Sequence, residues 1–150
     1  MNMNIKTVTA SLVLLLGAAP AWAVLGEPLS SVQSDHTYFR GMLVRVPRQG
    51  YELHQISAPD GTVVREYVSQ EGTVFGVSWQ GPVMPNLSQL LGSYVADFQQ
   101  ASQSPHARRG PLVVRTDRVV IESGGHMRAF HGRAYVPSLV PNNLTQAVVQ

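Results

Sequence analysis

Three runs of residues with strand-forming character follow one another in the first half of the chain, separated by two short turn sequences that each contain glycine. The runs are residues 51–57, 62–69 and 73–80, and the turns are residues 58–61 and 70–72. In the third run, Phe75, Val77 and Trp79 alternate with glycine or polar residues. A period of two is typical of a strand with one face on a core and the other toward solvent. The pattern predicts two successive hairpins.

The apolar positions change period after this third run, beyond a glycine and two prolines. Asn86 and Gln89 have the spacing of a capping box, in which each side chain satisfies a free backbone donor at the start of a helix. Apolar residues then recur at spacings of three and four: Leu87, Leu90, Leu91, Tyr94, Val95 and Phe98. We therefore predict an amphipathic helix from Asn86 to about Phe98, followed by a polar loop over 99–110. Six side chains are expected to be buried together, namely Leu91, Tyr94, Phe98, Phe75, Val77 and Trp79.

Two more strand-like runs, 112–122 and 126–136, follow that loop and flank a predicted turn at residues 123–125. The order β-β-β-α-β-β predicts an α+β fold, an antiparallel sheet of about five strands with the helix packed on one face. The other face must be solvated, covered by the N-terminal segment or used for binding. Two segments are poorly defined by pattern: residues 24–50, with at most one short helix around 30–40, and residues 142–150, expected to be frayed.

The N-terminus has the three parts of a secretory signal peptide. Residues 1–6 carry one basic side chain, Lys6, and no acid, and residues 8–17 form an apolar run too short to span a bilayer. Small residues at both ends of Ala21-Trp22-Ala23 suit signal peptidase. We expect residues 1–23 to be removed, leaving residues 24–150 as a single domain that is periplasmic or secreted. An uncleaved interfacial helix is the alternative.

Composition excludes several classes of protein. The chain has no cysteine, which rules out disulfides, a thiol nucleophile and a lipoprotein anchor. Once Lys6 is removed, ten basic and nine acidic side chains remain. This near balance does not indicate nucleic-acid binding, which needs a clear excess of basic residues. Six of the arginines lie in the last third of the chain: Arg108, Arg109, Arg115, Arg118, Arg128 and Arg133. They suit an anionic partner, or they are solvated residues on strand faces.

Four stretches are long and unusual: TVVREYV at 62–68, VFGVSWQGP at 74–82, LLGSY at 90–94 and GHMRAFHGRAYVP at 125–137. On these stretches the chain resembles a bacterial family known as domain of unknown function 2844, over nearly all of the expected mature domain. Asn86 departs from the pattern, which has an aspartate there. The resemblance implies an exported protein and carries no activity, ligand or catalytic residue.

The candidate binding residues are His126, Arg128, His131 and Arg133 in the last run, together with Arg65. In a regular strand, His126 and Arg128 share one face, and His131 and Arg133 share the other. Because an odd separation places the two histidines on opposite faces, and no third ligand lies nearby, we predict no metal site. Arg128, beside the predicted turn, is the favoured contact.

The residues leave two hypotheses of different classes. The favoured one is a non-enzymatic periplasmic binding or interaction module, whose partner is an anionic envelope ligand or another periplasmic protein. The alternative is a small cell-envelope hydrolase built around His126 or His131, although no serine lies in a nucleophile elbow. Arg65 and Glu66 lie on opposite faces of their strand, and a cross-strand ion pair explains Glu66 as well as acid catalysis does. We predict no catalytic residue, no cofactor and no membrane span after cleavage.

The leader yields the first prediction. Protein recovered from the periplasm or the medium should have the intact mass of residues 24–150, because signal peptidase cuts after a small residue that follows a short apolar run. Intact-mass spectrometry of fractionated cells measures this. A full-length chain confined to the cytoplasm would contradict it.

Overall fold

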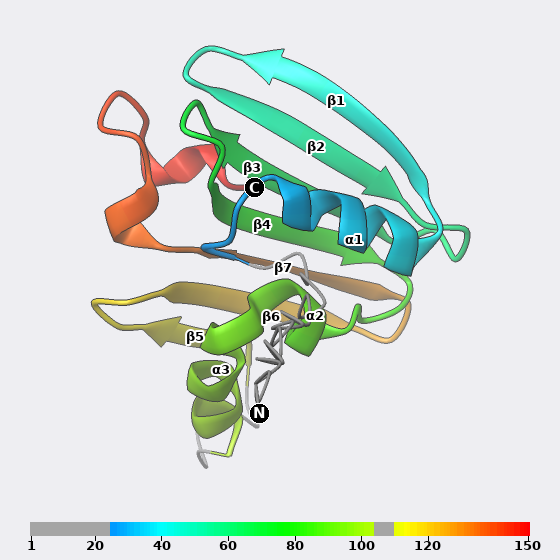
Figure 1. Cartoon of the computed structure of the whole chain (residues 1–150). Helices are drawn as coiled ribbons and strands as arrows, with labels where there is room; N and C mark the ends of the chain where they lie inside the picture. Colours follow the sequence, from blue (N-terminus) through cyan, green and yellow to red (C-terminus); the bar gives the residue numbers. More distant parts are fainter. Residues whose placement is uncertain (1–24, 104–109) are drawn as a thin grey trace, which may run out of the picture.

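The computed structural model describes residues 25–103 and 110–150. Seven strands form one antiparallel sheet in the order β1-β2-β3-β4-β7-β6-β5 (Figure 1). The strands are β1 (Met42–Arg48), β2 (Tyr51–Ser57), β3 (Val63–Ser69), β4 (Val74–Gly81), β5 (Leu112–Arg115), β6 (Val120–His126) and β7 (Ala129–Tyr135). Two meanders, β1 to β4 and β5 to β7, are therefore joined by the pairing of β4 with β7.

The helices α1 (Ser30–Phe39), α2 (Leu87–Leu91) and α3 (Val95–Ser102) lie along one face of this sheet (Figure 1). The predicted α+β class is confirmed, but the sheet has seven strands rather than about five. The predicted helix is also interrupted. Gly92 has φ 51° and ψ −121°, and the short 3-10 helix η1 (Gly92–Tyr94) separates α2 from α3. Segment 24–50, poorly defined by its pattern, contains α1 and the edge strand β1.

The third hairpin has its turn at a different place from the predicted one. Gly124 and Gly125 lie inside β6, and the two-residue turn is Met127–Arg128, between the paired residues His126 and Ala129. The run 112–122 also contains a turn, because the Thr116 hydroxyl accepts hydrogen bonds from the backbone N–H groups of residues 118 and 119. The predicted single strand over 112–122 is therefore divided between β5 and the first part of β6.

The main core lies between the sheet and the helices. It includes Val77 and Trp79 from β4 and Leu91 from α2, with Tyr94 and Phe98 packed against it, as predicted. Phe75 is the exception, because β4 contains a β-bulge there: Val74 pairs with Val68 and Gly76 pairs with Tyr67, so Phe75 has no partner on β3. The bulge breaks the alternation and turns Phe75 to the opposite face, away from the other predicted core residues.

Phe75 belongs to a second, smaller core on the face opposite the helices. There it packs with Tyr67, Tyr135 and Val149, and Val148 and Leu144 lie against the same cluster. The chain after β7 supplies this cover through the short 3-10 helices η3 (Pro137–Leu139) and η4 (Gln146–Val148). The tail from Asn142, expected to be frayed, is instead packed on the sheet, and Val149 is completely buried.

Leu91→Ala should lower the free energy of unfolding by about 2–5 kcal/mol, because Leu91 is completely buried between α2 and the sheet and its loss leaves a cavity. Chemical denaturation measures the difference. The control is Ser93→Ala, since Ser93 is exposed in the adjoining η1. Equal midpoints for the two variants would contradict this packing.

Candidate functional site

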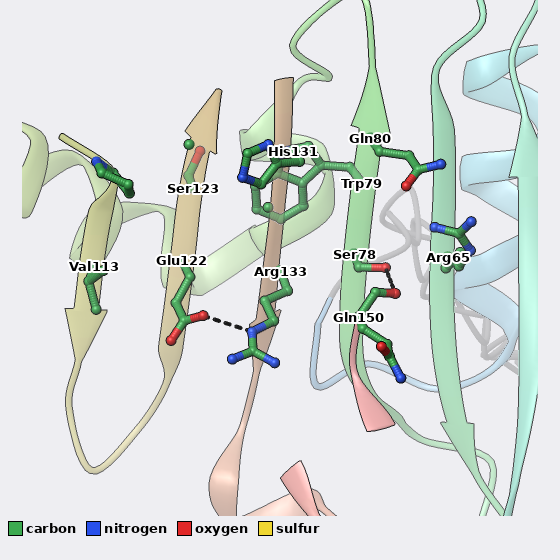
Figure 2. A pocket seen from close by; sticks show the side chains of 13 residues that line it. Arg65, Ser78, Trp79, Gln80, Val113, Glu122, Ser123, His131, Arg133 and Gln150 are labelled. Carbon is green, nitrogen blue, oxygen red and sulfur yellow. Dashed lines mark hydrogen bonds and ion pairs between the residues drawn. The ribbon is translucent and has the colours of Figure 1, made fainter. Parts of the chain in front are cut away.

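The C-terminal segment covers only part of its face of the sheet and leaves a groove across β3, β4, β7, β6 and β5 (Figure 2). The groove has a volume of about 410 Å³. Its polar lining consists of Arg65, Ser78, Gln80, Glu122, Ser123, His131, Arg133 and Gln150, while Val113 and Pro111 form an apolar wall at β5. These side chains come from five strands, and neighbouring positions are set by the registers of the two meanders.

Two glycines on neighbouring strands shape this groove. Gly124 is paired with His131, and a Cβ there would lie 3.4 Å from the His131 Nε2. That is an ordinary van der Waals distance, so the imidazole lies directly beside Gly124. Gly132, directed to the helix side, admits the Trp79 ring, because a Cβ there would lie 2.2 Å from Trp79 Cζ2. The ring passes behind β7 and lines the groove from beneath (Figure 2).

Arg133 is held by two partners. Its Nε donates to Glu122 Oε2 at 2.8 Å, and its Nη1 donates to the Val149 carbonyl at 3.0 Å. The other Glu122 oxygen accepts from Arg115 Nη2 at 2.8 Å. Arg133 therefore attaches the C-terminal segment to the sheet, and Glu122 neutralises part of the positive charge at this end of the groove.

Arg65, on β3, has a different environment. Its Nε donates to the Gln55 amide oxygen at 3.2 Å, and no carboxylate among the described residues pairs with it. A second hollow of about 510 Å³ shares Arg65, Gln80 and Gln150 with the groove and adds Arg48. His131, in turn, makes no hydrogen bond to the part of the chain that the structure describes. This side of the groove offers a cation that has no carboxylate partner among the described residues and an imidazole that makes no hydrogen bond to them.

The last residues of the chain show how this face binds a main chain. The Gln150 carbonyl accepts hydrogen bonds from the Tyr67 hydroxyl at 2.5 Å and the Ser78 hydroxyl at 2.8 Å. The Gln150 N–H donates to the Tyr67 oxygen at 3.0 Å. Ser78 and Gln150, whose hydrogen bond Figure 2 shows, line the groove, whereas Tyr67 belongs to the second core.

The structure brings together three of the five candidate binding residues, Arg65, His131 and Arg133, and places them around one groove. His126 and Arg128 lie elsewhere. His126 ends β6, with its Nδ1 3.1 Å from the Met127 carbonyl, and Arg128 occupies the turn with φ 66°. The prediction that these two share a strand face is wrong, because His126 ends β6 and Arg128 lies in the turn before β7. Arg128 borders a shallower hollow beside the groove.

A cross-strand ion pair was one of two explanations considered for Glu66, and the structure shows no such pair among the described residues. Its side chain is 1% exposed on the helix side, and it interacts with Asp35 rather than with an arginine. The groove residues that the sequence reasoning missed are Ser78, Gln80, Glu122 and Gln150. The alternation along β4 signals Ser78 and Gln80, which fall on the face away from the core, whereas no local pattern signals Gln150.

The geometry around His131 gives no support to the hydrolase alternative. The hydroxyl of Ser78 is engaged by Gln150, and Glu122 is engaged by two arginines, so neither orients His131. In residues 25–103 and 110–150, no three His, Asp or Glu side chains are arranged to hold a metal ion. None of the helices in those ranges is long and apolar enough to cross a membrane.

Comparison with known proteins agrees with the resemblance noted from the sequence. No curated protein and no solved structure matches the chain significantly. One family model does, and it matches residues 21–149, which include every strand and helix described above. The chain belongs to the family described as protein of unknown function (DUF2844).

Proposed function

We propose that this protein is an exported, non-enzymatic binding module that holds a small anionic ligand, carrying a carboxylate, in the groove on the open sheet face. The observation that carries the proposal is Arg65, a half-buried guanidinium in the groove whose described partner is one neutral amide. A guanidinium presents a planar fork of donors that matches a carboxylate in two parallel hydrogen bonds.

The charges around the groove favour one negative group over several. Arg133 is paired with Glu122, so Arg65 is the lining cation that remains without a countercharge among the described residues. Gln80 and His131 add further hydrogen-bonding groups, which suit the hydroxyls of a polar ligand. Small-molecule sites commonly have volumes of about 300–1,000 Å³, and the groove falls within that range.

Binding is favoured over hydrolysis because His131 lacks an orienting partner. A histidine that acts as a general base needs a positioned nucleophile on one nitrogen and a group that fixes the ring on the other. The neighbouring Ser78 and Glu122 already have other partners. His131 is therefore assigned a role in holding the ligand.

Export is supported by the leader at residues 1–23 and by its relation to the family match. The basic start and the apolar run lie outside the matched residues 21–149, as a removable targeting segment would. A binding module located in the periplasm or the medium meets small anions released from, or supplied to, the cell envelope.

Arg65→Gln should weaken anion binding at least about tenfold, because a hydrogen bond to a charged group contributes about 1.5–3 kcal/mol. The probes are acetate, glucuronate and inorganic phosphate, added separately at low salt to the mature protein, with glucose as the uncharged counterpart of glucuronate. Changes in the amide NMR signals of the groove residues measure binding. Added salt should reduce it through screening.

The matched control for that variant is Arg45→Gln. Arg45 is exposed on β1 and pairs with His54, so it faces the helix side and not the groove. It should bind the probes as the unmodified protein does. The proposal is wrong if none of the three anions shifts the groove signals, or if Arg65→Gln and Arg45→Gln bind equally.

Arg133→Gln should lower the free energy of unfolding by about 1–2 kcal/mol, a value reduced by partial solvent screening, because it breaks the bonds to Glu122 and to the Val149 carbonyl. Arg128→Gln should leave the unfolding midpoint unchanged, since Arg128 lies in an exposed turn. Urea denaturation of the two variants compares them. Equal midpoints would show that Arg133 does not attach the C-terminal segment.

A further inference from the structure

Helix α1 packs two apolar side chains on the main core, the buried Val32 and the partly buried Phe39. Its buried residues are Ser31, Val32 and Asp35, so two of the three are polar. No described side chain caps its start at Leu29, and its first turn has no acidic residue. Such a short helix is stabilised mainly by tertiary contacts. The contacts of Asp35 therefore have a large share in keeping α1 in place.

Asp35 meets two other buried polar side chains from different elements. Gln89, from α2, donates its amide N–H to Asp35 Oδ1 at 2.5 Å. This contact explains why Gln89 does not complete the predicted capping box, although the Asn86 side chain caps α2. Glu66, from β3, interacts with Asp35 from the sheet. Asp35 and Glu66 are each 1% exposed and Gln89 is 3% exposed.

Two ionised carboxylates cannot hydrogen-bond to each other, since both are acceptors only. Neither Glu66 oxygen receives a hydrogen bond from a donor in the described residues. A single proton on the pair changes this, because the protonated carboxyl then donates to the other. Burial raises the pKa of Glu66 well above its ordinary value, and the neighbouring Asp35 raises that pKa further. Burial also raises the pKa of Asp35, to about 6, although its hydrogen bonds with Glu66 and Gln89 oppose this.

The charged and titratable groups around the pair do not supply a compensating cation. His54 on β2 is opposite Glu66 in the strand register and is completely buried. Burial lowers the pKa of His54, an effect that Glu52 opposes and Arg45 on β1 reinforces. Burial thus favours the neutral form of His54. Arg45 itself is exposed beyond His54.

We propose that α1 docks on the sheet in a proton-dependent manner: the proton shared by Asp35 and Glu66 holds the helix, and loss of that proton releases it while the sheet stays folded. Once released, both carboxyls are solvated and ionise freely. The sheet retains its strand pairing and the second core beneath the C-terminal segment. The device is independent of the groove, which lies on the opposite face.

The direction of the effect follows from linkage. Both carboxyls have a higher pKa with α1 docked than the ordinary values of 3.8 and 4.5 that they regain on release. Docking is therefore strongest at acid pH, and it weakens as pH rises from about 4 through 6 and above. Over that window the ratio of released to docked protein grows by up to about tenfold per pH unit for each proton lost.

The absence of cysteine allows a direct measurement on the mature chain. Spin-labelled cysteines at Gln33, exposed on α1, and at Asp117, exposed between β5 and β6, report the position of the helix relative to the sheet. Pulsed electron paramagnetic resonance should give one narrow distance distribution at pH 5 and a broad one at pH 9. Circular dichroism of the strands should be the same at both pH values.

Glu66→Gln should keep the narrow distribution at pH 9, because the amide donates to the Asp35 carboxylate without needing a proton. Asp35→Asn provides a second variant with the same expectation, since its amide can donate to Glu66. Glu27→Gln is the matched control, because Glu27 is exposed just before α1, and it should behave as the unmodified chain does.

The proposal is overturned if the unmodified chain keeps its narrow distribution up to pH 9, or if the folded amide variants broaden as it does. It is also overturned if strand circular dichroism is lost together with the distance, because the whole fold and not α1 would then be responding. If one amide variant fails to fold, the other decides the outcome.

Discussion

The pairing of β4 with β7 is the contact on which the rest of the structure depends. It joins two meanders that each form from local hairpins, and it brings Trp79 opposite Gly132 and Ser78 opposite Arg133. Without it, Arg65 on the first meander and Glu122 on the second would belong to separate sheets, and no groove would exist. The pairing is also distant in sequence, so the chain must close a long loop before these contacts form.

The two faces of the resulting sheet are covered by different segments, and the groove lies on only one of them. The helices cover one face with a large apolar core that contains one buried carboxyl pair. On the other face, the C-terminal segment packs over the aromatic residues that the bulge at Phe75 gathers, and it leaves the polar remainder open. A single irregularity in β4 thus decides where apolar cover ends and the groove begins.

Local patterns predicted the class of the fold, the meander from β2 to β4, the start of α2 and the helix-side core apart from Phe75. They could not predict features set by partners distant in sequence. The Gly124–Gly125 pair looks like a turn, but it lies inside β6, where it pairs with His131 and Phe130 of β7. Glu66 looks like a surface acid, and only the position of α1 shows that Asp35 covers it. Three of the five candidate binding residues share one groove because β3 and β7 lie on either side of β4, a neighbour relation that no local pattern contains.

The engagement of Gln150 by Tyr67 and Ser78 has a practical consequence for anyone who handles this protein. Residues appended after Gln150 would leave the sheet at the mouth of the groove, where a flexible affinity tag or a fused reporter could occupy it. Histidine-rich tags are polar and partly cationic, so they would attract the same anions that the proposal assigns to Arg65 and would disturb a binding measurement. An internal tag in the exposed turn at Met127 leaves the groove end at Gln150 clear.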